Sequence, residues 1–192
     1  MTITESILNQ RIDTIFSLYE INGSDEYVGE PVSILEHSLQ AAQMAENEGF
    51  DCEIILAAFF HDIGHFLPNK NEMNGLGNIS HEVAGANFLY KNGFSNRVAL
   101  LVKNHVEAKR YLTFKYPEYY DKLSIASKQT LEFQGGKMKP DEADSFEKMP
   151  LFSIFLKMRQ WDDRAKEIDV SYPDLKKYKI MAKQHLSESI HS

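Results

Sequence analysis

The sequence has little cysteine and no long hydrophobic run. Cys52 is the only cysteine among the 192 residues, which excludes an internal disulfide and a cysteine-held iron–sulfur cluster. The longest unbroken apolar run, residues 54–60, is far shorter than the ~20 residues that a membrane-spanning helix needs. The N-terminal residues do not pair a basic segment with an apolar one, as a secretory signal would. We therefore expect a cytoplasmic protein with no membrane partner.

Basic residues are also fewer than acidic ones. The chain carries 21 Lys and Arg against 28 Asp and Glu, a formal net charge of −7, so a general nucleic-acid surface is not expected. A locally basic pocket for a small anion remains open. Hydrophobic residues make up 43% of the chain and charged residues 26%, which is typical of a globular protein. The length suits one domain, residues 1–192, with a core of its own.

Apolar residues recur at helical spacing along most of the chain, and no segment alternates as a strand would. The sequence therefore predicts an all-α fold. The expected helices cover residues 3–22, 31–45, 51–64, 80–91, 95–112 and 124–133, followed by a short helix from 140, a longer one after 150 and a last one near 173–187. Leu67–Ile79 is expected to be a loop and Tyr116–Tyr120 a turn. His185 and His191, in the polar tail, are expected to be solvated.

A series of histidines and aspartates lies on these predicted helices. It comprises His37, His61, Asp62, His81, His105 and Asp162. Its centre, His61–Asp62, directly follows the apolar run 54–60. Burying so many polar side chains is costly unless each has a partner, and a metal ion is the common partner of neutral imidazole and ionised carboxylate. Because a carboxylate has two oxygens, Asp62 is the natural bridge between two cations.

With Asp62 as the bridge, the rest of the series can be divided between two metal ions. His37 and Asp162 could complete one ion with His61, which leaves His81 and His105 for the second. Four histidines and two carboxylates leave coordination positions open on at least one ion. Such a nitrogen and oxygen set suits iron, manganese or zinc better than magnesium.

Two of these residues have a cationic side chain within one helical turn of them in the sequence. Lys109 lies one helical turn after His105, and Arg159 lies three residues before Asp162. A lysine with an arginine suits a phosphonate or phosphate, because arginine offers a fork of donors and lysine a point charge. Hydroxyl donors could come from Ser127 and Thr130, and His65, four residues after His61, lies close to the same site.

The series resembles the H…HD…D signature of the HD-domain superfamily, an all-helical metalloprotein fold populated mostly by phosphohydrolases. The residues that carry the resemblance are His37, His61, Asp62 and Asp162. The additional His81 and His105 match its two-metal branch. His65 departs from the hydrolases, which have a lysine at that point of the motif.

The closer resemblance is to the PhnZ-type mixed-valent diiron oxygenases, and it runs from about Tyr27 to Lys166. It is carried by Tyr27–Glu30, His61–His65, His105–Tyr111 and Arg159–Asp163. The resemblance implies one HD domain with a core over about residues 27–170, on which the N-terminal and C-terminal helices pack. It also implies two iron ions, Fe(II) and Fe(III), with O2 as co-substrate.

The same resemblance implies a substrate and roles for the residues around the metals. The reaction would be oxidative cleavage of the carbon–phosphorus bond of a 1-hydroxyalkylphosphonate, with (R)-2-amino-1-hydroxyethylphosphonate giving glycine and phosphate. The phosphonate pocket would be lined by His65, Lys109, Ser127 and Arg159. Lys109, His65 and Arg159 would also stabilise charge on the departing phosphorus group. Tyr27 would ligate the resting ferric ion until substrate displaces it, and Glu30 would pair with a substrate ammonium.

Three alternatives use the same ligand series. A metal-dependent phosphohydrolase or phosphodiesterase would use the metals to activate water, and it is the main alternative. An inositol-type ring-cleaving oxygenase shares the two-iron plan, but the short chain and the absence of further basic contacts disfavour it. A ligand sensor without catalysis is disfavoured because no ligand position is lost.

Overall fold

The computed structural model describes residues 5–25, 27, 29–68, 73 and 75–188, and all regular structure in this part of the chain is helical. This confirms the predicted all-α fold. The helices are α1 (Glu5–Asn22), α2 (Ile34–Asn47), α3 (Cys52–Phe60), the 3-10 helix η1 (Ile63–Phe66), α4 (His81–Lys91), α5 (Asn96–Lys115), α6 (Pro117–Lys122), α7 (Ile125–Phe133), α8 (Pro140–Glu147), α9 (Phe152–Arg164) and α10 (Leu175–Glu188). Within the described residues, no helix is both long and apolar enough to cross a membrane.

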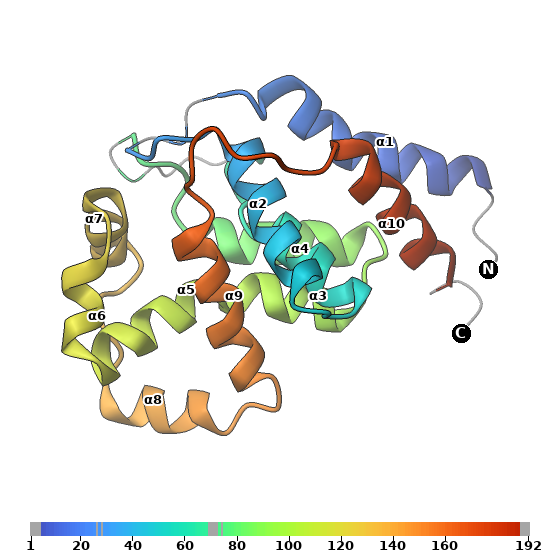
Figure 1. The fold of residues 1–192 in the computed structure, drawn as a ribbon. Helices are drawn as coiled ribbons and strands as arrows, with labels where there is room; N and C mark the ends of the chain where they lie inside the picture. Colours follow the sequence, from blue (N-terminus) through green and yellow to red (C-terminus); the bar gives the residue numbers. More distant parts are fainter. Residues whose placement is uncertain (1–4, 26, 28, 69–72, 74, 189–192) are drawn as a thin grey trace.

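Helix α3 lies at the centre of the fold, and every residue from Ile54 to Phe60 is buried. It contacts α2, α5 and α10, and α5 in turn contacts α4 and α9. Figure 1 shows α1 and α10 side by side at one end of the molecule, with α6, α7 and α8 at the other. Because α3 is apolar all round, it is stable only when neighbours cover it on every side. Its C-terminal end therefore delivers the next residues of the chain into the interior.

The second helix begins at Ile34, so the predicted start at Pro31 was wrong. Ser33 is the N-cap: its side chain accepts from the Glu36 N–H at 3.2 Å, and Glu36 Oε2 accepts from the Ser33 N–H at 2.8 Å. This reciprocal capping box satisfies two of the backbone donors that the first turn of a helix leaves without an intrahelical partner.

The third helix ends at Phe60, so the predicted end near residue 64 was also wrong. Asp62 has φ −100° and ψ 6°, which leaves the α-helical region, and the chain continues as η1. Gly64 allows η1 to approach α4 closely, because a Cβ at this position would lie 1.9 Å from the His81 carbonyl oxygen. His61 and Asp62 thus lie at a helix end, where their side chains can face several helices.

Two further predictions were wrong. The expected turn at Tyr116–Tyr120 contains most of α6, which Pro117 opens at its first turn, where the missing N–H is not needed. His185 is buried rather than solvated: its ring stacks on Phe94 with centroids 5.6 Å apart, and its Nε2 accepts from the Ser95 N–H at 3.4 Å. His191 lies outside the described residues.

Candidate metal centre and substrate pocket

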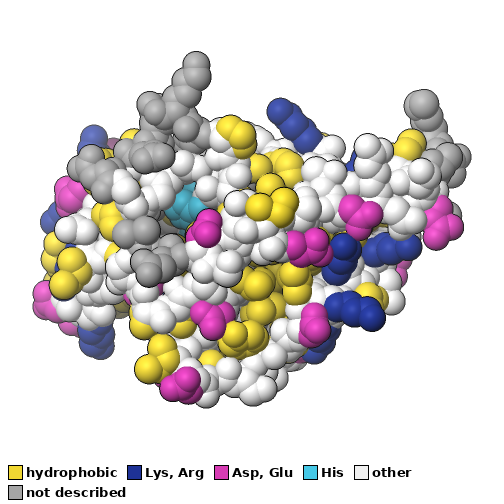
Figure 2. Space-filling model, turned by 90° about the horizontal axis from the view of Figure 1, so that it is seen from above, with side chains coloured by type: hydrophobic (Ala, Val, Ile, Leu, Met, Phe, Trp, Pro, Cys, Tyr) yellow, Lys and Arg dark blue, Asp and Glu magenta, His cyan; other side chains and the backbone are white. Residues whose placement is uncertain are grey.

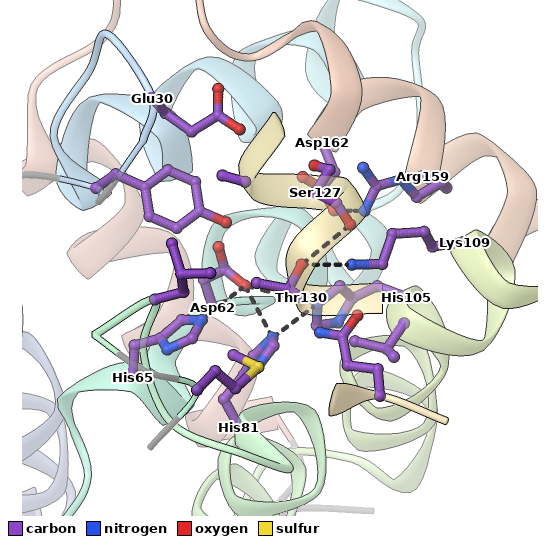
Figure 3. A pocket seen from close by; sticks show the side chains of 16 residues that line it. Glu30, Asp62, His65, His81, His105, Lys109, Ser127, Thr130, Arg159 and Asp162 are labelled. Atoms are coloured by element: carbon purple, nitrogen blue, oxygen red, sulfur yellow. Dashed lines mark hydrogen bonds and ion pairs between the residues drawn. The ribbon is translucent and has the colours of Figure 1, made fainter. Parts of the chain in front are cut away.

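The six residues of the predicted series come together in the interior. They arrive from α2, the end of α3, the start of α4, α5 and α9, and each is at most 5% exposed. Asp162 arrives from α9, far along the chain, while Asp62 follows the buried centre of α3. Figure 3 shows Asp62 lying close to His81 and His105 at the base of a pocket.

The two carboxylate oxygens of Asp62 face different pairs of histidines. Oδ2 lies 3.7 Å from His37 Nε2 and 3.4 Å from His61 Nε2. Oδ1 lies 3.3 Å from His81 Nε2 and 3.5 Å from His105 Nε2. Among the described residues, Asp62 Oδ2 has no hydrogen-bond partner, which is costly for a buried carboxylate oxygen. This is the arrangement of a carboxylate that bridges two cations.

The tautomers of three histidines follow from their backbone contacts. The Nδ1 atoms of His37, His61 and His105 lie 2.8, 2.8 and 2.7 Å from the carbonyl oxygens of Ala165, Ala58 and Val102. A carbonyl only accepts, so each Nδ1 carries a proton, and in the neutral ring each Nε2 then presents a lone pair to the centre. Burial also lowers the pKa of His61 to about 4, which keeps its Nε2 unprotonated.

The facing Nε2 lone pairs of neutral His37 and His61 lie too close together without a cation. The Nε2 atoms of His37 and His61 are 3.0 Å apart, and those of His81 and His105 are 3.1 Å apart. Two facing lone pairs repel each other, whereas a metal ion accepts both. Together with the unpartnered oxygen of Asp62, this repulsion indicates that the residues fit a dinuclear metal centre.

Asp162 completes the first group and leaves the second with fewer protein ligands. Its Oδ1 lies 3.3 Å from His37 Nε2 and 3.9 Å from His61 Nε2. The first group can therefore offer two imidazoles and two carboxylates, while the second offers His81, His105 and one oxygen of Asp62. This division matches the predicted one. It leaves open coordination positions at the second group.

His65 differs in its tautomer from His37, His61 and His105. Its Nδ1 accepts from the Asn78 N–H at 3.2 Å, so the proton of the neutral ring lies on Nε2, 3.9 Å from Asp62 Oδ1. Burial lowers the pKa of His65 to about 3, and the neighbouring His81, on which it stacks at 4.0 Å, adds to that shift. In the neutral ring, His65 Nε2 therefore presents an N–H rather than a lone pair.

A pocket opens beside the second group. His81 and His105 line it, together with Lys109 of α5, Ser127 of α7 and Arg159 of α9. Neither His37 nor His61 lines this pocket. A histidine side chain is visible from outside the molecule in Figure 2. The pocket thus brings the predicted substrate residues to the metal group that has open positions.

Lys109 is the pocket cation without a carboxylate partner among the described residues. Its ammonium donates to Thr130 Oγ1 at 3.0 Å, and the residue is only 3% exposed. Burial, followed by the nearby charge of Arg159, lowers the pKa of Lys109 to about 7. An anion in the pocket would supply the missing counter-charge.

Arg159 contacts Asp162 and Asp163, as its helical spacing allows, and also Tyr119, which its sequence position did not indicate. Its guanidinium donates to Asp162 Oδ2 at 2.7 Å, to Tyr119 Oη at 2.8 Å and to Asp163 Oδ1. Tyr119 in turn donates to Asp163 Oδ2 at 2.6 Å. Arg159 lines the pocket, but two carboxylates already neutralise it, and it holds Asp162 so that Oδ1 faces the histidines.

The predicted Tyr27 and Glu30 lie on a tight turn against α7. The Glu30 N–H donates to the Tyr27 carbonyl at 2.8 Å. Gly29 has φ +82°, which favours glycine, and a Cβ there would lie 2.8 Å from Ala126 Cβ. The Tyr27 ring lies 4.9 Å from that of His37. The turn therefore holds both side chains at the pocket, which they line.

Sequence reasoning missed one residue that lines the pocket and one that lies next to it. Gln134 lines the pocket, and its buried Oε1 has no partner among the described residues. It follows Thr130 by four residues, so the helical spacing of Ser127, Thr130 and Gln134 could have revealed it. Lys166, which binds Glu30 at 2.6 Å, gave no such local signal.

Comparison with known proteins places the chain in a family. The HD domain family matches residues 34–148, and the chain therefore belongs to the HD-domain family. The chain is 39% identical over 165 residues to 1-hydroxy-2-(trimethylamino)ethylphosphonate dioxygenase (glycine-betaine-forming) of Leisingera caerulea, covering 85% of this chain and 84% of the relative. It is 36% identical over 183 residues to hydroxymethylphosphonate dioxygenase of Gimesia maris, covering 94% and 90%.

A third relative has no stated activity. It is an uncharacterized protein of Acanthamoeba polyphaga mimivirus, 44% identical over 183 residues, which are 94% of this chain and 84% of the relative. The two named dioxygenases and the histidine and aspartate cluster together define a PhnZ-type HD-domain oxygenase, a metal-dependent enzyme. This confirms the family resemblance that the sequence indicated.

Proposed function

We propose that the protein is a diiron oxygenase that uses O2 to cleave the carbon–phosphorus bond of a 1-hydroxyalkylphosphonate. The lead substrate is (R)-2-amino-1-hydroxyethylphosphonate, with glycine and phosphate as products. The names of two relatives support the phosphonate class. We also propose that residues 1–192 form one HD domain, which is supported by a hydrophobic core with members from Leu8 in α1 to Leu186 in α10.

One observation carries this proposal: the histidine pair with open coordination positions faces a pocket that contains an anion-binding set. His81 and His105 line the pocket, and so do the Lys109 ammonium and the His65 ring. A phosphonate oxygen and the neighbouring hydroxyl could occupy the open positions while Lys109 neutralises the phosphonate charge. A substrate bound in this way presents the carbon that carries phosphorus to the metal group.

We propose iron, in a mixed Fe(II)/Fe(III) pair, as the metal. The ligand set of imidazoles and carboxylates is one that iron accepts, and His37, His61, Asp162 and Asp62 would hold one ion. His81, His105 and Asp62 would hold the other. When bound, the two irons supply the redox chemistry that allows O2 to react at a carbon–hydrogen bond.

The protein side chains bind the phosphonate and stabilise the charge that develops on it. Lys109 contributes a positive charge, which a bound anion favours, in a site from which water is largely excluded, where the charge interacts more strongly than on a surface. His65 contributes an Nε2–H that cannot become a competing ligand, because its Nδ1 already accepts from Asn78. Ser127 and Thr130 contribute hydroxyls from one face of α7.

Tyr27 would have to move when substrate binds. The pocket has a volume of about 40 Å³, room for roughly three waters, which is too little for a phosphonate. Burial, followed by the charge of Asp62, raises the pKa of Tyr27 well above its usual value. The Tyr27 side chain would therefore bind a metal ion only as the phenolate that the cation favours. A substrate that takes the same coordination position would displace Tyr27 from the metal.

The proposed reaction balances without a further reductant. The hydrogen on the carbon that bears phosphorus is removed, and the carbon–phosphorus bond breaks. One oxygen atom of O2 ends in the carboxylate of glycine and the other in phosphate. Carbon is oxidised by four electrons, and O2 accepts all four.

The test is anaerobic purification with metal analysis, followed by phosphate release from (R)-2-amino-1-hydroxyethylphosphonate with and without O2. We expect iron in the protein, phosphate only in the presence of O2, and one O2 consumed for each phosphate. Phosphate release without O2 would instead identify the hydrolase. An Asp62→Asn variant is the matched control, because it keeps the side-chain shape but removes the bridging charge.

A further inference from the structure

Glu30, at the edge of the pocket, is already bound to an ammonium group of the protein itself. Lys166 Nζ lies 2.6 Å from Glu30 Oε1, and Ser124 Oγ donates to the same oxygen at 2.6 Å. The Glu30 side chain is 7% exposed and that of Lys166 is 15% exposed. The pair is therefore largely removed from water, where the attraction between its charges is stronger than on an open surface.

The two oxygens of Glu30 are not equivalent. Oε1 accepts from both Lys166 and Ser124, whereas no hydrogen bond to Oε2 is found among the described residues. Glu30 lines the substrate pocket and Lys166 does not. Figure 3 shows Glu30 on the opposite side of the pocket from His81. The Glu30 carboxylate thus lines the substrate pocket, while the Lys166 ammonium outside that pocket neutralises its charge.

Lys166 lines a second cavity, of about 330 Å³. Asp163 and Tyr119 also line it, and Glu30 does not. An ammonium that left Glu30 would therefore find open space and the Asp163 carboxylate, rather than being buried without a partner. Displacement of Lys166 is then far less costly than the loss of a fully buried ion pair.

We propose that Lys166 is a specificity-determining residue that competes with the ammonium end of a phosphonate substrate for Glu30. This inference rests on the proposed function. A substrate without an ammonium leaves the Glu30–Lys166 pair intact. A substrate with one must either share the carboxylate with Lys166, against the repulsion of two like charges, or displace it towards the second cavity.

The inference predicts a selective effect of removing the Lys166 charge. Lys166→Met keeps most of the stem but leaves Glu30 uncompensated and free to attract a substrate ammonium. For 2-amino-1-hydroxyethylphosphonate we expect KM to fall about tenfold or more, because a full charge is removed at short range in a poorly solvated site. For hydroxymethylphosphonate, which has no ammonium, KM should stay within about twofold, and kcat should change little for either substrate.

The experiment measures KM and kcat of the iron-loaded enzyme for both substrates, together with anaerobic dissociation constants by calorimetry. Lys122→Met is the matched control, because Lys122 lines the same second cavity and is exposed. We expect it to behave like the wild type. In a Glu30→Gln background, Lys166→Met should no longer change the discrimination between the two phosphonates.

Three outcomes would overturn the inference. A parallel change of both KM values would assign Lys166 a structural role, and a rise for the amino substrate alone would make Lys166 a support of ammonium binding. A different result concerns only the proposed reaction: the phosphonates bind but are not oxidised. The dissociation constants of wild type and Lys166→Met then still show whether Lys166 competes with the substrate ammonium for Glu30. If the wild type binds neither phosphonate, the proposed function and this inference fail together.

Discussion

Gly77 lies so close to the His65 ring that a single added methyl group tests the role of that histidine. A Cβ at Gly77 would lie 2.4 Å from His65 Nδ1 and 2.5 Å from Cε1. Such distances are too short for any real contact, so Gly77→Ala must push the ring away. The adjacent loop cannot yield freely, because the Asn78 side chain donates to the carbonyls of Gly64 and Leu67.

Gly75 provides a matched control in the same loop. Both glycines have positive φ, +84° for Gly75 and +100° for Gly77, but nothing lies within 4 Å of a Cβ at Gly75. An alanine at either position suffers a backbone penalty of about 1–2 kcal/mol. For a chain of this length that penalty lowers the melting temperature by about 2–8 °C. The two variants therefore differ in that only the alanine at position 77 would collide with the His65 ring.

The expected loss of activity follows from the loss of one hydrogen bond to a charged group. Such a bond contributes about 1.5–3 kcal/mol, which corresponds to about a 10- to 150-fold loss in kcat/KM. Gly77→Ala should show this loss in phosphate release, and Gly75→Ala should not. Metal content should match the wild type in both, because His65 donates through Nε2–H rather than ligating.

Two results would refute this reasoning. If both variants had the same kcat/KM, the His65 ring would not contribute a donor to the substrate. If Gly77→Ala lost iron while Gly75→Ala kept it, His65 would support the metal instead. Thermal melts of both proteins show whether the backbone penalties are matched.

Three further predictions follow from buried charged or titratable groups. Asp62→Asn should lose most of its bound metal in elemental analysis, because a neutral amide cannot bridge two cations; full metal content would contradict the bridge. Lys109→Met should melt at a higher temperature than the wild type, since burial lowers the Lys109 pKa to about 7, and yet its KM for phosphonates should rise about tenfold or more. Burial lowers the pKa of His185, so the unfolded state takes up a proton near pH 6.5 before the folded state does, and stability falls as pH drops below about 6.5. His185→Gln should flatten this fall in urea unfolding at successive pH values, and an unchanged slope would contradict it.

The helices and the metal-ligand series follow from local features of the sequence. Periodicity of apolar residues identifies a helix because its neighbours lie three and four residues apart. The His61–Asp62 pair after a fully apolar helix signals buried polar side chains that need a partner. The position of Asp62 between two groups of histidines was also predictable, since only a carboxylate offers two oxygens. Lys109 and Ser127 could be placed near the site because they share helix faces with His105 and Thr130.

Only the tertiary structure decided how these groups act on each other. Lys166 binds Glu30 across 136 positions of the chain, and the His37 Nδ1 contact to Ala165 spans 128. The His65 tautomer depends on the Asn78 N–H, which a loop brings back to the ring. Local patterns record which face of a helix is buried but not which distant atom meets it. The sequence by itself thus determined a set of ligands that suits two metal ions. The packing of distant segments decided that His65 presents an N–H and that the Glu30 carboxylate is already paired with the Lys166 ammonium.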